Sequence, residues 1–283
     1  AEVERMPMPL GYPRQRISGR MVIGLIVAAA ALIGYFARTS INPVTGQKQH
    51  VALSVDQEIA MGLEAAPEMA QEFGGLDPDP QRQQAVERMG QQLVAAIPKA
   101  SQVYPFEFHV LADPRTVNAF TLPGGKVFIT AGLLDRLQTP GQLAGVLGHE
   151  VGHAIERHSA EHLAKAQLTQ GISGAIAVGT YDPNRSGSAA AGIAAALAAQ
   201  MIELKYGRSD ELEADRDALK FMAQAGYDPR AMIEVMKILE KASGGRSTPD
   251  WLSSHPNPGN RIEHIEEEIK DLFPDGVPTG LTN

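Results

Sequence analysis

Residues 139–162 read TPGQLAGVLGHEVGHAIERHSAEH, and this stretch decides how the chain is organised. Thr139 is a helix-capping residue, Pro140 suits the first helical position, and Gln142 completes a capping box. The apolar residues that follow recur at helical spacing: Leu143, Val146, Leu147, Val151 and Ile155. The sequence therefore predicts a helix with one apolar side that begins at Thr139 and continues through His158 and beyond.

Within this helix, His149-Glu150-Val151-Gly152-His153 is an HExxH pattern, with two histidines four residues apart on one face. Both imidazoles can therefore reach one metal ion, and zinc favours such nitrogen ligands. Glu150 lies beside the metal position without being a ligand, so it can act as the general base for the attacking water. The pattern alone also occurs in unrelated proteins, but a capped helix with an apolar side gives it context.

A third ligand has to come from another part of the chain. The extended pattern HExxHxxGxxH is absent, because Glu156 and Ser159 replace its Gly and its last His. A later segment, ELEAD at residues 211–215, offers Glu211 and Asp215 on one helical face. One of them can bind the metal while the other holds a ligand imidazole by its free N–H. Taken alone, a solvated acidic helix face is the alternative for this segment.

Together, HEVGHAIERHSAE (residues 149–161) and YGRSDELEADRDA (residues 206–218) resemble the zinc endopeptidase family of HtpX, the CAAX prenyl protease and the beta-barrel-assembly-enhancing protease. Members of this family pair HExxH with ExxxD. The resemblance therefore implies one zinc ion per chain, with Glu211 as its third ligand and Asp215 as the residue that orients a ligand histidine. It covers about residues 54–270 and implies a zincin-type (gluzincin) catalytic domain.

The segment SHP at residues 254–256, with Arg261-Ile262, resembles the C-terminal element of the same family. The resemblance implies that His255 approaches the zinc as an extra ligand or lies near the reacting carbonyl, where it would stabilise the oxyanion. A purely structural role is the alternative. Arg261 is expected to orient His255, to bind Asp215, or to serve only in packing.

Short β-prone runs precede the catalytic helix. Phe106, Phe108 and Val110 alternate with polar residues, and residues 118–121 and 126–130 flank a Pro-Gly-Gly turn, which predicts a strand and a hairpin. An edge strand can hold an extended substrate beside the metal through main-chain hydrogen bonds. We expect this strand to contain the substrate-binding residues Val127, Phe128, Ile129 and Thr130, with a plain structural hairpin as the alternative. The predicted fold class is α+β, predominantly helical, with a small β-sheet beside the active-site helix.

Residues 21–37 (MVIGLIVAAAALIGYFA) carry no charge. As a helix they would be about 26 Å long, close to the thickness of a bilayer's hydrocarbon core. Arg14, Arg16 and Arg20 precede this run, so the positive-inside rule places the N-terminus in the cytoplasm and the body outside. A cleaved signal sequence is the alternative.

The predicted organisation has four parts: a cytoplasmic segment (1–20), a transmembrane anchor or signal sequence (21–37), a linker (38–53) and a zinc metallopeptidase domain (54–283). This makes the chain a single-pass protein of the inner membrane with its catalytic domain on the periplasmic side. The Gly/Ala-rich residues 171–202 are consistent with buried helices, a mobile flap or a surface that touches the bilayer.

Another histidine pair, His158 and His162, follows the HExxH pattern at the same four-residue spacing. On a continuous helix, His158 would lie about 180° around the axis from His149. We therefore expect both to be structural or surface residues. The chain has no Cys, which excludes thiolate zinc sites and cysteine nucleophiles. A net charge of −8 without a basic run in the body argues against nucleic-acid binding.

These expectations combine into a zinc endopeptidase that hydrolyses polypeptide substrates with metal-activated water. The resemblance implies that the substrates are misfolded or unassembled envelope or membrane proteins. One alternative is a binding or chaperone module whose zinc site is held closed by His255 or by residues 171–202. A protease that faces the cytoplasm is another. The oligomeric state does not follow from these residues.

Overall fold

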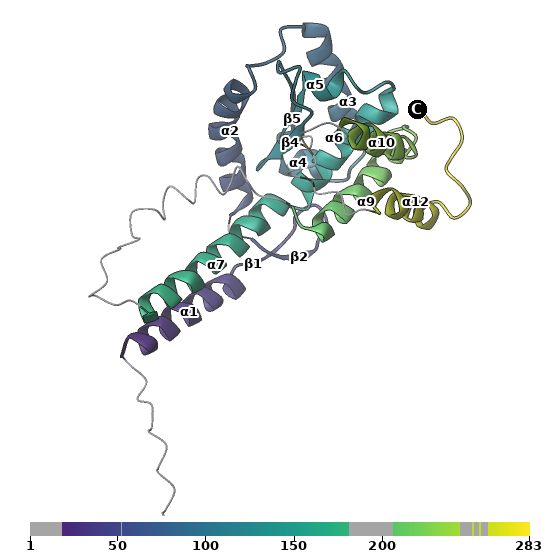
Figure 1. Ribbon diagram of the computed structural model, residues 1–283. Helices are drawn as coiled ribbons and strands as arrows, with labels where there is room; N and C mark the ends of the chain where they lie inside the picture. Colours follow the sequence, from purple (N-terminus) through teal and green to yellow (C-terminus); the bar gives the residue numbers. More distant parts are fainter. Residues whose placement is uncertain (1–18, 52, 181–205, 244–250, 252–254, 256–259) are drawn as a thin grey trace, which may run out of the picture.

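The computed structural model describes residues 19–51, 53–180, 206–243, 251, 255 and 260–283. Helices dominate and the sheets are small, so the predicted fold class is confirmed (Figure 1). The helices are α1 (Gly19–Ala37), α2 (Val55–Glu72), α3 (Pro80–Ala95), α4 (Ala100–Val103), α5 (Ala131–Leu134), α6 (Pro140–Ile155), α7 (His158–Thr180), α9 (Arg208–Gln224), α10 (Ala231–Ser243) and α12 (Arg261–Leu272). The strands are β1 (Thr39–Ile41), β2 (Lys48–His50), β3 (Glu107–Leu111), β4 (Ala119–Leu122) and β5 (Lys126–Thr130).

The three-stranded sheet has the order β3-β5-β4, with β5 parallel to β3 and antiparallel to β4. The predicted strand and hairpin are thus present. However, β5 is the central strand and all five of its residues are buried. The expectation that residues 127–130 form an edge strand is wrong, because β5 pairs with β3 on the side that does not face β4. The edge next to α6 is β4.

Helix α6 begins where the sequence predicts, but the Gln142 side chain accepts a hydrogen bond from the Gln138 N–H at 2.6 Å and so does not complete the predicted capping box. The Thr139 side chain accepts a hydrogen bond from the Gln142 N–H at 3.3 Å, and Pro140 occupies the first turn. Small residues then let α6 approach α9 closely. A Cβ atom added at Gly152 would lie 3.2 Å from the Cα and carbonyl oxygen of Ala214. This close approach brings the HExxH and ExxxD segments together.

The helix does not continue through His158 as predicted. It ends at Ile155, Arg157 has a φ of 60°, and α7 begins at His158. A left-handed conformation costs a non-glycine residue about 1–2 kcal/mol. Tertiary contacts hold Arg157 in place, since its Nε lies 3.2 Å from both carboxylate oxygens of Glu58 and its Nη2 donates to the carbonyl of Leu53 at 2.8 Å.

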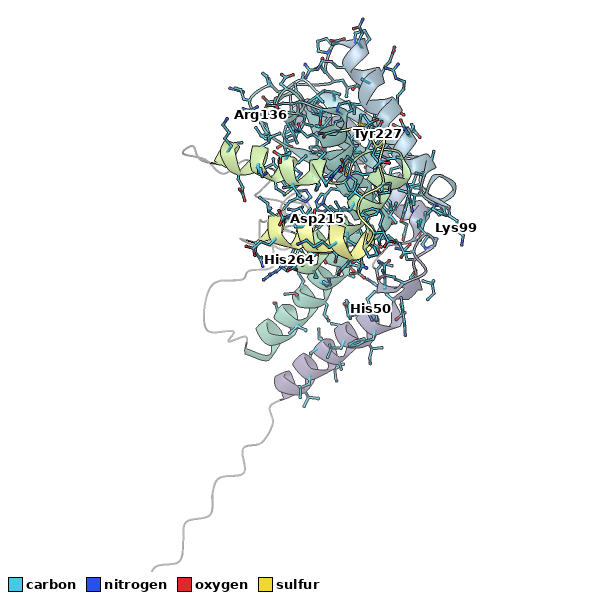
Figure 2. The ribbon with its side chains drawn as sticks, turned by 90° about the vertical axis from the view of Figure 1, so that its right-hand side faces the viewer. His50, Lys99, Arg136, Asp215, Tyr227 and His264 are labelled. Atoms are coloured by element: carbon cyan, nitrogen blue, oxygen red, sulfur yellow. The ribbon has the colours of Figure 1, made fainter. Side chains whose placement is uncertain are left out.

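Residues 38–53, predicted as a linker, contain the β1–β2 hairpin. Two buried side chains of this segment cap the end of α6. Asn42 donates to the carbonyl of Ile155 at 2.7 Å, and Gln49 donates to the carbonyl of Glu156 at 2.5 Å. His50 stacks on the Tyr35 ring of α1 with centroids 4.9 Å apart, and Figure 2 shows it beside that helix.

Helices α1 and α7 lie side by side and project away from the rest of the molecule (Figure 1). Large apolar side chains of α1 are exposed: Val22, Ile23, Leu25, Ile26, Val27, Leu32, Ile33 and Phe36. Among the described residues, none of the helices has the length and apolar character needed to span a bilayer, so the predicted span at 21–37 is not confirmed. Most of the Gly/Ala-rich segment lies outside the described residues, and residues 171–180 end α7.

Candidate metal centre

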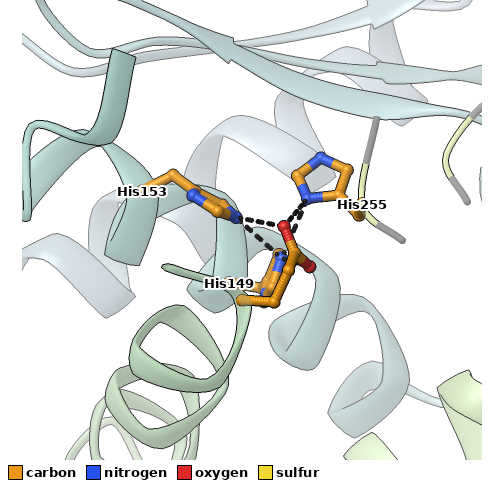
Figure 3. Close-up of side chains that lie close together, drawn as sticks. His149, His153 and His255 are labelled. Atoms are coloured by element: carbon orange, nitrogen blue, oxygen red, sulfur yellow. Dashed lines mark hydrogen bonds and ion pairs between the residues drawn. The ribbon is translucent and has the colours of Figure 1, made fainter. Parts of the chain in front are cut away.

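Four side chains from three parts of the chain converge in the interior. His149 and His153 come from α6, Glu211 comes from α9, and His255 comes from the segment before α12. Each offers one donor atom, and these atoms all lie within 4.8 Å of one another (Figure 3). All four residues are buried. The structure therefore brings together the three predicted ligands and the histidine whose role was left open.

The distances between neighbouring donor atoms are close to those between the ligands of a zinc ion. His149 Nε2 lies 3.0 Å from His153 Nε2 and 3.2 Å from His255 Nδ1. Glu211 Oε1 lies 3.0 Å from His255 Nδ1 and 3.4 Å from His153 Nε2. Ligands at 2.0–2.1 Å from a tetrahedral ion are about 3.4 Å apart. Imidazole nitrogens and a carboxylate are also the ligands that zinc prefers when no thiolate is present.

Asp215 and Arg261 contact two of the four donor residues, His149 and Glu211. Asp215 Oδ1 lies 2.9 Å from His149 Nδ1, and Arg261 donates to both carboxylate oxygens of Asp215 at 2.7 Å. Arg261 Nη1 also lies 2.9 Å from Glu211 Oε2. Figure 2 places Asp215 next to α12, the helix that begins with Arg261. Of the roles expected for Arg261, the contact with Asp215 is present.

Glu150 lies beside the four donors, since its Oε1 is 3.5 Å from His255 Nε2, and each of its carboxylate oxygens has a hydrogen-bond donor within reach. The Thr121 hydroxyl lies 3.0 Å from Oε2 and 3.0 Å from the main-chain oxygen of Glu150. The Trp251 indole N–H donates to Oε1 at 3.4 Å. Because Thr121 belongs to β4, an edge strand of the sheet contacts the expected general base.

Comparison with known proteins decides the family. Residues 80–269 match the sequence model of peptidase family M48. The chain belongs to peptidase family M48. The mitochondrial metalloendopeptidase OMA1 of Schizosaccharomyces pombe is 31% identical over 88% of this chain and 72% of its own length. OMA1 of Bos taurus is 32% identical, and the beta-barrel assembly-enhancing protease of Yersinia pestis is 29% identical.

These relatives confirm the predicted family and, at the level of the family, the prediction of a metalloendopeptidase. The match covers 84% of this chain for the Bos taurus protein and 91% for the Yersinia pestis protein. The chain spans only 47% and 53% of the lengths of these two relatives.

The pKa shifts at the M48 site set the charge of each proposed ligand in the metal-free protein. Burial opposes a charge on His149, but hydrogen bonds to Asp215 and Glu211 raise its pKa to about 9. Burial, together with the charges of His149 and His255, lowers the pKa of His153 well below its ordinary value. Burial opposes ionisation of Glu211, but the three histidines hold its pKa far below the usual range. In the metal-free protein His153 is thus neutral and Glu211 is ionised, as metal binding requires, whereas His149 holds a proton that it has to release when a metal binds.

Two aromatic residues of the M48 site were not predicted. The Tyr206 ring stacks on His153 with centroids 3.9 Å apart, and the Trp251 ring stacks on His255 with centroids 4.7 Å apart. Tyr206 begins the segment that resembles the family, and Trp251 is the only tryptophan in the chain. Neither position carries a spacing pattern that identifies it in a single sequence.

The remaining predicted residues lie elsewhere or behave differently. Val127 to Thr130 form most of the buried central strand, where Thr130 caps α5 through the Leu133 N–H at 3.2 Å. His158 does not lie on the far side of a continuous helix. Its Nδ1 lies 2.8 Å from Nδ1 of His153, because the chain turns at Arg157.

Proposed function

We propose that this chain is a zinc-dependent endopeptidase that binds one zinc ion through His149, His153 and Glu211. The observation that carries the proposal is the convergence of these buried donors beside Glu150, whose two carboxylate oxygens each have a hydrogen-bond donor within reach. Membership of peptidase family M48 supports the same activity.

A zinc ion at this site would lower the pKa of the attacking water and polarise the scissile carbonyl. Glu150 accepts the proton of that water and later delivers it to the leaving amine. Thr121 and Trp251 hold the carboxylate in position for both transfers. Asp215, itself fixed by two hydrogen bonds from Arg261, holds the His149 ring by Nδ1 so that Nε2 faces the site.

We infer that the substrate is an extended polypeptide that pairs with β4 rather than with β5. The β5 strand is paired on both sides, whereas β4 is an edge strand that contacts α6 and carries Thr121. Main-chain pairing ignores side-chain identity, so it suits unfolded segments of many proteins. Together with the similarity to OMA1 and to the beta-barrel assembly-enhancing protease, this supports misfolded or unassembled envelope and membrane proteins as the substrate class.

We also propose that the chain associates with a membrane through α1 and acts on its extracytoplasmic side. The eight exposed apolar side chains of α1 support this, as do Arg14 and Arg16 before the helix and Arg20 in its first turn. Flotation with vesicles would test the association. Replacing Leu25 and Ile26 by Glu should leave the protein in the unbound fraction, and a variant that still floats would contradict this assignment.

One observation favours a second candidate function. His255 Nδ1 lies at the distance from His149 and Glu211 that a fourth ligand would have. Zinc sites with four protein ligands are closed, whereas catalytic sites keep one position for water. The alternative is therefore a binding or chaperone module whose zinc site is latched by His255.

Zinc content measured by elemental analysis, together with casein hydrolysis, tests both candidates. The endopeptidase predicts about one zinc per chain with cleavage by the wild type, less zinc in Glu211→Ala, and full zinc without cleavage in Glu150→Gln. Full zinc with no cleavage by the wild type would favour the latched module. An absence of zinc from the wild type would contradict both.

A further inference from the structure

Each histidine of the HExxH pattern has to direct one ring nitrogen at the metal and satisfy the other. For His149 the second nitrogen faces Asp215, a carboxylate of the kind that usually serves this purpose. For His153 the second nitrogen, Nδ1, faces Nδ1 of His158 at 2.8 Å, and both rings are buried. A histidine is a less common partner for a ligand imidazole than a carboxylate. It can accept a hydrogen bond from His153 only through an Nδ1 atom that carries no proton.

The contacts of His158 fix which of its nitrogens donates. Its Nε2 lies 3.4 Å from Glu213 Oε2, and the other oxygen of Glu213 accepts a hydrogen bond from Gln47 at 3.1 Å. An ionised carboxylate only accepts hydrogen bonds, so a neutral His158, which has a single N–H, carries it on Nε2. The Nδ1 atom of His158 is then an acceptor. Its partner, His153, must hold its proton on Nδ1, which leaves the Nε2 lone pair free for the metal.

The backbone builds this contact. Arg157 takes a left-handed conformation after α6 ends, and the chain turns so that His158 returns to the face that carries His153. Glu58 fixes the Arg157 guanidinium, and Asn42 and Gln49 bind the last carbonyls of α6. The turn therefore has partners in α2 and the β1–β2 hairpin, which makes the position of His158 a property of the fold.

We propose that His158 is a positioning residue that fixes the Nδ1–H tautomer and the ring orientation of His153, through a chain of hydrogen bonds that continues to Glu213 and Gln47. This inference rests on the proposed zinc site. It assigns Glu213 a supporting role, although this residue lies between Glu211 and Asp215 and is not one of the four donors.

The test compares His158→Leu, which removes the acceptor, with His158→Gln, whose side-chain carbonyl can accept the same hydrogen bond. Zinc affinity is measured by competition with a chelator. We expect His158→Leu to bind zinc about 10–100-fold more weakly and His158→Gln to recover most of the loss. His162→Leu is the matched control, because His162 lies one turn further along α7 and pairs with Asp210 instead of a ligand. Its zinc affinity should match the wild type.

Nitrogen-15 NMR of the histidine side chains in the metal-free protein tests the same hydrogen bond without zinc. The wild type should show His153 protonated at Nδ1, and His158→Leu should lose this preference while the melting temperature of the metal-free protein stays close to that of His162→Leu. Unchanged zinc affinity in His158→Leu, or a His153 proton on Nε2 in the wild type, would overturn the proposal. If the wild type bound no zinc, the zinc function would fail, but the NMR result would still decide the role of His158.

Discussion

The Nδ1 atom of His255 lies 3.2 Å from the Nε2 atom of His149, although 106 positions separate the two residues in the sequence. The His255 ring is completely buried and is packed against Trp251. With His255 in this place, four protein donors surround the metal position. Water and a substrate carbonyl therefore compete with His255 for the same space.

We expect His255→Ala to retain about one zinc per chain and to cleave casein faster than the wild type. A gain of about tenfold corresponds to about 1.4 kcal/mol no longer spent on displacing the ring. Steady-state rates with zinc content measured on the same samples check this. A fall in rate at unchanged zinc would instead assign His255 to the reacting carbonyl oxygen, the other role considered for it.

Thr121 should act on catalysis through Glu150. Thr121→Val removes the hydroxyl that lies 3.0 Å from the Glu150 carboxylate, so the general base is less well oriented. We expect kcat to fall by about 10–100-fold with little change in KM, because one buried hydrogen bond to a charged group contributes about 1.5–3 kcal/mol. Thr121→Ser should restore most of the rate. Thr169→Val, on an exposed part of α7, is the control. An equal loss in Thr121→Ser would contradict this role.

Gly152 should be needed for the distance between α6 and α9. A Cβ atom there would lie 3.2 Å from the Ala214 backbone, so Gly152→Ala must push the ligand-bearing helices apart. We expect a loss of about 1–3 kcal/mol in the free energy of unfolding, together with weaker zinc binding. In the control Gly34→Ala nothing lies within 4 Å of the added Cβ, so its stability should be unchanged or slightly higher. Wild-type zinc affinity in Gly152→Ala would count against this account.

The parts of the site that follow from local geometry were predictable from the sequence. Two histidines four residues apart share a helix face wherever that helix packs, and the same holds for Glu211 and Asp215. Thr139 and Pro140 mark the start of α6 for equally local reasons. The contact between these two helices can be predicted only through the resemblance to a family, because helical spacing does not say which helices pack together.

Tertiary contacts determine what the sequence did not predict. Nothing local favours a left-handed Arg157, which is held by Glu58 and by the carbonyl of Leu53. Local spacing therefore predicts a continuous helix with His158 on the side away from His149, which is wrong. The central position of β5 is also non-local, because the pairing of β3 decides which side of a hairpin stays free.

Glu156 should make the stability of the protein depend on pH. Its burial, followed by the negative charges of Glu213 and Asp217, raises its pKa to about 8. The unfolded chain has the ordinary, lower value, so the stability linked to this group is fully present below about pH 4.5 and is lost as pH rises towards 8. The Glu156→Gln variant carries no charge at this position, so its free energy of unfolding should exceed that of the wild type by about 1–3 kcal/mol at pH 9 and be similar at pH 5. Denaturant unfolding of both proteins in the presence of a metal chelator measures this difference. Groups that both proteins contain, such as His149, titrate in both and do not contribute to the difference. Glu72→Gln, at an exposed position in α2, should show no such trend. A difference between Glu156→Gln and wild type that stays constant from pH 5 to pH 9 would show that Glu156 is ionised in the folded protein throughout this range.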